Sequence, residues 1–232
     1  MHTFYIPELV DSDSIQTLSE EESLHACKVL RLQNGAHVRI INGKGLEAVA
    51  EIDFIHHKKT AIRILNKPVF ESLHYDLHIA IAPTKMNERM EWFVEKATEI
   101  GVTAISFLNC QNSERKNINI DRFKRIALSA MKQSQRTHLP ELNDLIHFQE
   151  FCEMHPNGFI AHCYNSEKKT IEDYQTKKEA IVMIGPEGDF SLEEVEFAFK
   201  HNYKPLSLGA NRLRTETAGI VAATQFIQRI TH

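Results

Sequence analysis

Residues 181–218 read IVMIGPEGDFSLEEVEFAFKHNYKPLSLGANRLRTETA. Two apolar runs in this stretch, Ile181–Ile184 and Leu206–Leu208, each end in a glycine-containing turn that leads to a helix. The turns are GPEG at 185–188 and GAN at 209–211. Because such turns leave backbone N–H and C=O groups uncovered by side chains, they can cradle a polar small molecule. The pair predicts a ligand site, which does not by itself define an activity.

Strand and helix alternate on both sides of this stretch, from about residue 71 to residue 232. Further strands are predicted at Leu77–Ala82, Thr103–Leu108 and Phe159–Cys163, and helices at Asn87–Ile100 and Asp121–Arg136. Ser191 with Glu194 fits a capping box, and two helices are predicted to begin there and near Thr215. These lengths suit right-handed crossovers, so residues 71–232 are predicted to form an α/β domain with a mainly parallel sheet.

The first 70 residues show a different pattern of short strands and turns. Strands are predicted at Phe4–Ile6, Val38–Ile41, Glu47–Ile52 and Lys59–Leu65, with a short helix at Ser23–Val29. Asn42-Gly43 favours a tight hairpin turn. Residues 11–22 read as an acidic polar stretch and residues 66–75 as a linker. The pattern predicts a small β-barrel of a size that often binds RNA, with Lys28, Arg31, Arg39 and Lys44 available for phosphate.

Composition bounds the class of protein. The 232 residues are 42% hydrophobic and 25% charged, as in an ordinary soluble globular protein. No apolar run approaches the ~20 residues of a membrane span, and the first residues lack the layout of a signal peptide. We therefore expect a cytoplasmic protein that does not bind membranes. The four cysteines form no CxxC pair and the thirteen histidines no HExxH motif, so no metal site is predicted.

The formal net charge of −4 argues against a uniformly basic surface, but nucleic-acid binding needs only a local patch. Residues 111–140 carry such a bias. Its basic residues are Arg115, Lys116, Arg122, Lys124, Arg125, Lys132 and Arg136, against only Glu114 and Asp121. The bias fits either a solvated helix face or a phosphate-binding surface.

Three common ligand motifs are absent. The turn GPEGDF does not match the GxGxxG of dinucleotide enzymes. The chain also lacks the GxxxxGK[ST] loop of P-loop ATPases and the GxSxG elbow of serine hydrolases. What remains is a ligand site without a phosphate clamp.

The motif order identifies a resemblance. The signature consists of IGPEG at 184–188, LG at 208–209 and LRTETA at 213–218, with EKATEIGV at 95–102, SER at 113–115, and QS at 133–134 followed by Arg136. Together these resemble the SPOUT RNA methyltransferases, and among them the uridine-N3 family called ribosomal RNA small subunit methyltransferase E. The likeness covers nearly the whole chain. It implies a PUA-like β-barrel at 1–70, a SPOUT domain with a trefoil knot at 71–232, an S-adenosyl-L-methionine site and a homodimer.

The resemblance also implies roles for matching residues. The donor-binding residues would be Ile184, Gly185, Glu187, Gly188, Leu208, Gly209, Leu213 and Thr217. The candidates for catalysis are Arg214, Glu216 and Arg136, and those for RNA contact are Arg31, Arg115, Lys116 and Arg136. The implied substrate is a uridine of 16S ribosomal RNA, in the assembled small subunit.

Two positions depart from the family pattern. The family commonly reads LGPRILR where this chain has LGANRLR at 208–214, so Asn211 replaces an arginine and Arg212 stands one place later. A guanidinium moved by one residue is expected to point elsewhere. Asp189 stands where a second glycine is usual, and we expect it to help cap the next helix.

The implied reaction is direct methyl transfer to uracil N3, which must lose its proton. Arg214 and Arg136 could hold the uracil anion or a phosphate. Glu216 is either the proton acceptor or a first-turn carboxylate favoured by the helix dipole. Because N3 lies on the pairing edge, the uridine must be unpaired or flipped out. The alternatives are a related methyltransferase for another base or a ribose 2′-OH, and a non-catalytic RNA-binding protein.

Overall fold

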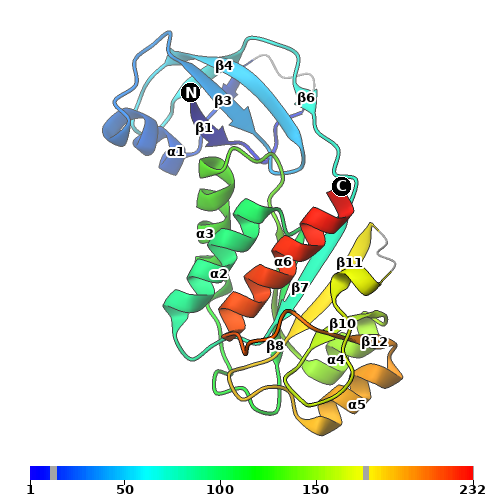
Figure 1. The fold of residues 1–232 in the computed structure, drawn as a ribbon. Helices are drawn as coiled ribbons and strands as arrows, with labels where there is room; N and C mark the ends of the chain where they lie inside the picture. The colour runs from blue at the N-terminus through cyan, green and yellow to red at the C-terminus, as the bar shows by residue number, and fades with distance from the viewer. Residues whose placement is uncertain (11–14, 175–177, 232) are drawn as a thin grey trace. The chain divides into compact units, whose positions relative to one another are not determined.

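The computed structural model describes residues 1–10, 15–174 and 178–231, and the chain forms two compact units (Figure 1). The first consists of Met1–Leu73 and Met131–Leu139, and the second of His74–Ala130 and Pro140–His232. The division after residue 73 lies close to the predicted boundary at 70/71. The sequence pattern did not indicate that residues 131–139 return to the first unit.

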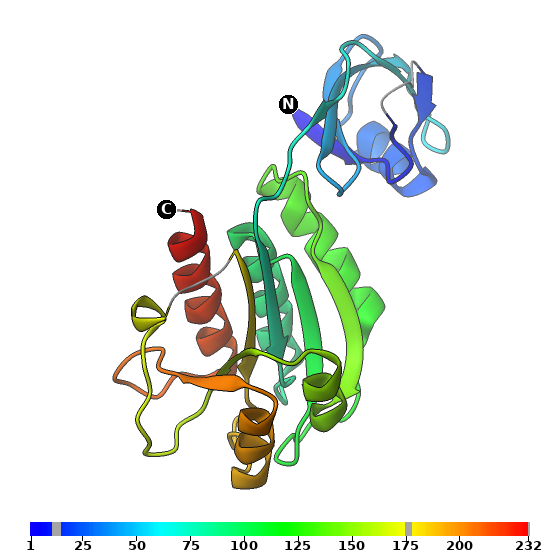
Figure 2. The ribbon, with the colours of Figure 1, turned by 90° about the vertical axis from the view of Figure 1, so that its right-hand side faces the viewer.

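The first unit is built on a six-stranded sheet that curls around its own core (Figure 2). The strand order is β1 (His2–Tyr5), β3 (His37–Ile41), β4 (Leu46–Phe54), β5 (Ala61–Ile64) and β2 (Ile15–Thr17), and β6 (Val69–Phe70) also pairs with β4. Among the described residues of this unit, the β1–β3 pair is parallel and the other strand pairs are antiparallel. The helix α1 (Glu20–Leu24) continues into the π-helical turn η1 (His25–Val29). The predicted strand-rich, barrel-like unit is confirmed.

Two strands of this unit lie where none was predicted. β2 falls within the predicted polar stretch, of which residues 11–14 lie outside the described part of the chain. β6 falls within the predicted linker. Both are short, and they join the sheet through backbone hydrogen bonds to β5 and β4, so their side chains carry little strand signal.

The predicted hairpin turn between β3 and β4 is present. Asn42 Oδ1 accepts hydrogen bonds from the backbone N–H groups of Lys44 (2.8 Å) and Leu46 (3.0 Å). Gly43 and Gly45 have φ angles of +72° and +94°, which glycine adopts without steric cost.

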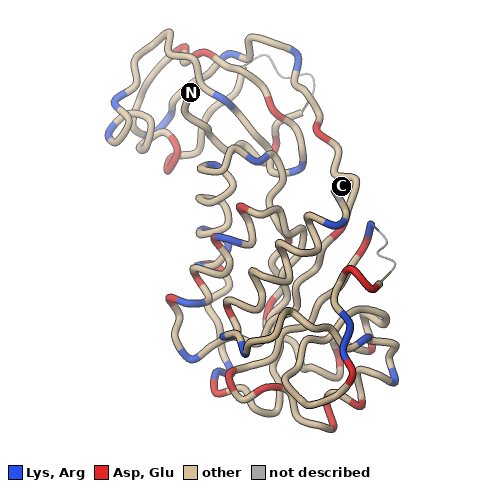
Figure 3. Tube along the Cα trace, viewed as in Figure 1, with Lys and Arg blue, Asp and Glu red and all other residues tan. Residues whose placement is uncertain are grey.

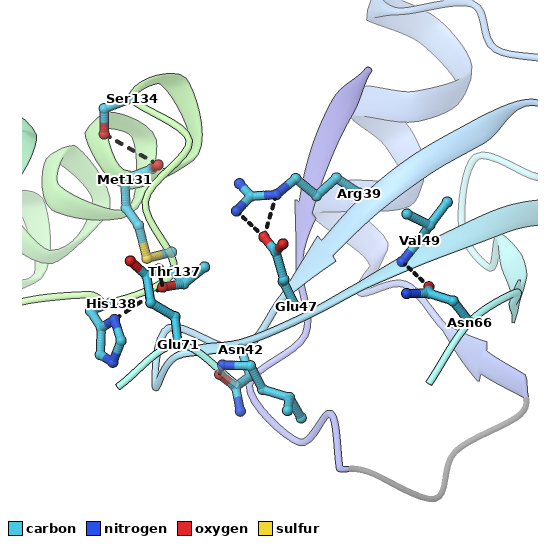
Figure 4. A network of polar contacts seen from close by, with 11 residues as sticks. Arg39, Asn42, Glu47, Val49, Asn66, Glu71, Met131, Ser134, Thr137 and His138 are labelled. Atoms are coloured by element: carbon cyan, nitrogen blue, oxygen red, sulfur yellow. Dashed lines mark hydrogen bonds and ion pairs between the residues drawn. The ribbon is translucent and has the colours of Figure 1, made fainter. Parts of the chain in front are cut away.

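A polar network joins residues 131–139 to this hairpin and to Glu71, the residue after β6 (Figure 4). Gly45 N–H donates to Thr137 O at 3.0 Å, and Leu139 N–H donates to Gly43 O at 2.9 Å. The Thr137 hydroxyl also donates to the Glu71 carboxylate. These contacts place Arg136, within the same segment, in the framework of the first unit.

The second unit contains a six-stranded sheet in which every pair is parallel. The strand order is β12 (Tyr203–Leu206), β10 (Gly158–Ala161), β11 (Glu179–Ile184), β7 (Asp76–Ile81), β8 (Ala104–Asn109) and β9 (Glu141–His147). The predicted parallel α/β sheet is confirmed. The strand expected at 206–208 instead ends at Leu206, and β9 was not predicted because its sequence, ELNDLIH, is largely polar.

Helices cover both faces of this sheet. α2 (Asn87–Ile100) packs against α6 (Thr215–Thr231), and α6 contacts β7 and β11. α3 (Ile120–Gln133) lies over β8, where the Phe107 and Phe123 rings stack at 4.9 Å. α4 (Phe148–Met154) and α5 (Leu192–Lys200) share a core cluster with the alternate strand residues Ala80 and Leu108, so they cover the other face. The trefoil knot implied by the resemblance concerns chain threading and stays a prediction.

The predicted helix ends agree with the structure in part. Ser191 Oγ accepts from Glu194 N–H at 3.2 Å and Glu194 Oε2 accepts from Ser191 N–H at 2.8 Å, so the predicted capping box is confirmed. α3 ends at Gln133 rather than at Arg136, because Gln135 takes a left-handed φ of +59°. A short 3₁₀ helix, η2 (Ile171–Asp173), precedes β11.

Candidate functional site

The candidate site lies at the carboxyl ends of three neighbouring strands. β10 stands between β11 and β12, so the two glycine turns of the sequence flank the end of β10. Two adjoining cavities open there, one of about 300 Å³ beside the β11 turn and one of about 410 Å³ beside the β12 turn. They share the lining residues Ala161, Cys163, Arg212, Leu213 and Ala218. The edge of a parallel sheet is where open α/β folds bind ligands.

The structure brings most of the predicted donor-binding residues together. Those in the first cavity are Ile184, Gly185, Glu187 and Leu213, and those in the second are Leu208, Gly209 and Leu213. The two remaining residues, Gly188 and Thr217, line neither cavity. The carbonyl of Gly188 instead accepts a hydrogen bond from Asn112 Nδ2 at 3.4 Å.

The first cavity is held in shape by contacts around Gly185. Thr215 Oγ1, at the start of α6, donates to Gly185 O at 3.0 Å. A Cβ atom on Gly185 would lie 3.1 Å from the backbone N of Phe190, which is closer than most Cβ contacts. The absence of a side chain therefore allows the β11 turn to fold tightly back on itself. In the second cavity, Gly209 has a φ of +136°, which residues with a side chain rarely adopt.

Asp189 links the turns after β10 and β11. Its Oδ2 accepts from Cys163 N–H at 2.7 Å, and its Oδ1 accepts from Phe190 N–H at 2.9 Å. Its φ of +65° lies in the left-handed region, which aspartate is among the few residues other than glycine to tolerate. The expectation that Asp189 caps the next helix is wrong, because Ser191 is the N-cap.

Glu187 and Arg212 connect the loops on either side of the first cavity. Glu187 Oε1 accepts from Lys85 N–H at 3.0 Å, and Glu187 O accepts from Arg212 Nη2 at 3.2 Å. Arg212 lines both cavities, whereas Asn211 lines only the second. The displaced guanidinium of this chain therefore remains at the site and braces two loops.

The three catalytic candidates lie in different places. Arg214 is exposed and lines the first cavity. Glu216 is buried, lines neither cavity, and has its Oε1 atom 3.7 Å from Arg89 Nε of α2. Arg136 belongs to the first unit. Only Arg214 therefore joins the donor-site residues in the cavity lining.

Some of the basic residues predicted to contact RNA make contacts within the chain. Arg115 Nη2 donates to Lys85 O at 2.6 Å, and its Nη1 donates to the Asn87 side chain. Lys116 and Arg31 are exposed. Charges of both signs are spread along each unit (Figure 3).

Ion pairs reduce the basic bias of residues 111–140. Arg122 pairs with Glu91 at 2.7 Å, and Lys132 pairs with Glu22 at 2.8 Å. This part of the segment fits the solvated helix face better than a continuous phosphate-binding surface.

Sequence reasoning missed the contribution of β10. Its end supplies Ala161 and Cys163 to both cavities and His162 to the second. The strand was predicted, but only the sheet order shows that it lies between the two glycine turns. His162 is buried, which lowers its pKa, and Lys168 lowers that pKa further. Within the described residues neither of its ring nitrogens has a hydrogen-bond partner.

Residues 1–10, 15–174 and 178–231 contain neither a candidate metal cluster nor a candidate membrane-spanning helix. No group of three or more His, Cys, Asp or Glu side chains there is placed to hold a metal ion. None of the helices in this part of the chain has the length and apolar character needed to cross a membrane.

Comparison with known proteins identifies the family of both parts of the chain. Residues 71–227 match the protein-family model described as RNA methyltransferase domain. Residues 18–65 match the family model described as RNA methyltransferase PUA domain. The ribosomal RNA small subunit methyltransferase E of Buchnera aphidicola subsp. Acyrthosiphon pisum is 30% identical over 95% of this chain and 90% of its own length.

Solved structures agree with these matches. A probable rRNA-methyltransferase from Porphyromonas gingivalis has a TM-score of 0.89 and 36% identity, covering 99% of this chain and 98% of its own. A putative methyltransferase from Legionella pneumophila, solved in complex with the bound cofactor SAM, has a TM-score of 0.87 and 29% identity, covering 98% and 96%. The chain is thus a member of the RNA methyltransferase family, and within it of the ribosomal RNA small subunit methyltransferase E group.

Proposed function

We propose that this protein transfers a methyl group from S-adenosyl-L-methionine to N3 of a uridine in 16S ribosomal RNA. The observation that carries the proposal is the pair of cavities at the ends of β10, β11 and β12, formed by the motifs that mark this family. The relatives named for small-subunit ribosomal RNA methylation support the substrate, and the Legionella structure, solved with SAM, supports the donor.

The residues of the two cavities suit this donor. Their volumes, about 300 and 410 Å³, fall in the range of small-molecule sites. Gly185 and Gly209 line the cavities without a side chain, while Ile184, Leu213 and Ala218 offer apolar surface to a flat ring. The donor supplies a methyl group activated by its bond to a sulfonium sulfur. Once the methyl group is transferred, the remainder of the donor is a neutral thioether.

Methylation at N3 requires that the N3–H proton leaves as the N–CH₃ bond forms. Arg214, exposed in the lining of the first cavity, is the candidate to stabilise negative charge on the uracil. Arg136 is proposed to contact RNA from the first unit. For Glu216 we favour the structural alternative, since its carboxylate faces Arg89 rather than the cavities.

The remaining partners are inferred from the same function. N3 is on the Watson–Crick edge, so the target must be unpaired or flipped when it enters the site. We propose the small ribosomal subunit as the substrate particle, a homodimer as the active form and the cytoplasm as the location. Arg31, Arg115 and Lys116 are proposed to contact RNA phosphates.

The main alternative is a methyltransferase of the same fold acting on a ribose 2′-OH or another base. Members that act on ribose usually have an Asn-Val-Ser type of turn where this chain has Glu216-Thr217-Ala218, which counts against this alternative.

Nucleoside mass spectrometry of ribosomal RNA from a deletion strain tests the proposal. Loss of 3-methyluridine, restored by the intact gene, is the expected result. Persistence of 3-methyluridine with loss of a 2′-O-methylated nucleoside would favour the alternative instead.

A further inference from the structure

The tip of the β4–β5 hairpin, residues 54–60, carries an exposed group of aromatic and basic side chains that the donor site does not use. Phe54 is 55% exposed, although it is a large apolar residue. Its ring is stacked with that of His56, with centroids 6.2 Å apart and planes 14° from parallel. The His57 ring lies 4.3 Å from that of His56. Lys58 and Lys59 follow directly and are both exposed.

The exposure of Phe54 has a structural cause. The pairing of β4 with β5 shifts register between Ile52 and Phe54, so Ile52 opposes Ile62 while Phe54 opposes Ala61. Ile52 is fully buried, whereas Phe54, two residues later, is turned to the surface. Irregularities of this kind re-aim side chains at sheet edges. Burial in the core therefore does not explain why a phenylalanine stands here.

The tip is also pre-organised. His56 N–H donates to Thr60 Oγ1 at 3.2 Å, and Thr60 Oγ1 donates to His56 O at 2.9 Å. Lys59 N–H donates to the same carbonyl at 3.2 Å. Thr60 is fully buried, and its N–H donates to Ser23 Oγ at 2.9 Å. A surface held in this way loses little conformational entropy when a ligand binds.

The local charge balance favours an anionic ligand. Asp53 is the nearest acid in the sequence, and Arg63 on the facing strand neutralises it in an ion pair. Glu51, two residues earlier on β4, lies 3.7 Å from Nε2 of His37 on β3. The positive charges of Lys58 and Lys59 can therefore attract an anionic ligand beside the stacked rings. Stacking platforms flanked by cationic side chains are the usual means of holding single-stranded nucleic acid.

We propose that the tip binds an unpaired stretch of the RNA substrate, with a base stacked on Phe54 and His56 and adjacent phosphates contacted by Lys58 and Lys59. The inference rests on the proposed function, which supplies the RNA, and assigns it a contact outside the donor site. The tip anchors substrate and takes no part in the chemistry.

Binding of the full chain to a fluorescein-labelled oligouridine of about 12 nucleotides, followed by anisotropy at several salt concentrations, tests the proposal. Phe54→Ala is expected to weaken binding about tenfold, the usual loss of one base stack. The Lys58→Gln, Lys59→Gln double variant should make the slope of log K against log salt shallower by about 1.4, because two phosphate contacts are lost. Phe70→Ala is the matched control: Phe70 is 64% exposed on β6 and lies outside the tip.

Steady-state methylation of small ribosomal subunits separates this proposal from the proposed function. Phe54→Ala should raise the KM for subunits and leave kcat and donor affinity unchanged. A wild-type chain that transfers no methyl group to RNA contradicts the proposed function itself. If the wild type methylates but does not bind the oligouridine, or if Phe54→Ala binds it as the wild type does, the tip is not an RNA site. A KM increase without loss of oligouridine affinity would assign the tip to a ribosomal protein and overturn the proposal.

Discussion

Thr215 Oγ1 donates a 3.0 Å hydrogen bond to the carbonyl of Gly185, joining the first residue of α6 to the turn that follows β11. Both residues are buried and both line the first cavity. They come from the two ends of the stretch that marks the family, residues 184–188 and 213–218. The bond therefore fixes one wall of the donor site against another.

Replacing Thr215 with valine should weaken donor binding. The substitution keeps the shape of the side chain but leaves the buried Gly185 carbonyl without its partner, at a cost of about 1 to 3 kcal/mol. Calorimetry should show an S-adenosyl-L-methionine Kd about two- to twelvefold higher if half of that cost falls on the bound state. Thr224→Val is the control, because Thr224 Oγ1 donates to Ile220 O at 2.9 Å within α6 and lines neither cavity. Equal donor affinity in both variants would contradict this role of Thr215.

Asp189 should be more sensitive to alanine than to asparagine. Asp189→Ala loses two side-chain hydrogen bonds and places an unfavourable residue at a φ of +65°. We expect a loss of about 2 to 3 kcal/mol in the free energy of unfolding, measured in urea. Asp189→Asn tolerates the left-handed conformation and keeps one of the two acceptors, so it should cost less than the alanine variant, about 1 to 2 kcal/mol. An alanine variant as stable as the wild type would show that the bridge to Cys163 contributes nothing.

Glu216→Gln decides between the two roles of this residue. The carboxylate lies 3.7 Å from Arg89 and lines neither cavity, so the variant is expected to keep kcat within about threefold of the wild type. Intact donor binding, measured in parallel, shows that the site has remained folded. A fall in kcat of about a hundredfold or more with unchanged donor affinity would instead identify Glu216 as the proton acceptor.

His78 should make the stability of the second unit depend on pH. Burial lowers the pKa of His78 from 6.5 to about 4, with a further contribution from His155 that Asp76 partly opposes. The unfolded chain therefore binds a proton at this position more readily than the folded chain, and stability falls as the pH drops from 6.5 towards 4. Between pH 7 and pH 5 the loss at this site is about 2 kcal/mol.

The matching variant is His78→Gln, which keeps a polar group near Ser106 Oγ, 2.8 Å from His78 Nε2. Urea unfolding at the two pH values should show a drop smaller by about 2 kcal/mol in the variant than in the wild type. The same drop in both proteins would place the acid sensitivity elsewhere.

Features that depend on neighbouring residues were predictable from the sequence. The Ser191–Glu194 capping box and the turn at Asn42-Gly43 need only three or four residues, and both are present. The alternation of strand and helix was sufficient to predict a parallel sheet. The motif order likewise identified Ile184, Gly185, Leu208, Gly209 and Leu213, which line the cavities.

Features that depend on distant pairing were not predictable. The position of β10 between β11 and β12 follows from the sheet order, so no local pattern indicated that Ala161 and Cys163 line both cavities. Residues 131–139 join the first unit through Thr137 and Leu139, whose partners lie more than sixty residues earlier in the chain. Asp189 was misassigned because its carboxylate bonds to Cys163 rather than to the adjacent helix.

The most direct test of the account is methyl transfer by the purified protein. Small ribosomal subunits from a strain lacking this enzyme would be incubated with methyl-labelled S-adenosyl-L-methionine, and the 16S ribosomal RNA digested to nucleosides and analysed by mass spectrometry. The account predicts that the label appears in 3-methyluridine. Label in a 2′-O-methylated nucleoside or on another base, or no transfer to RNA at all, would contradict it.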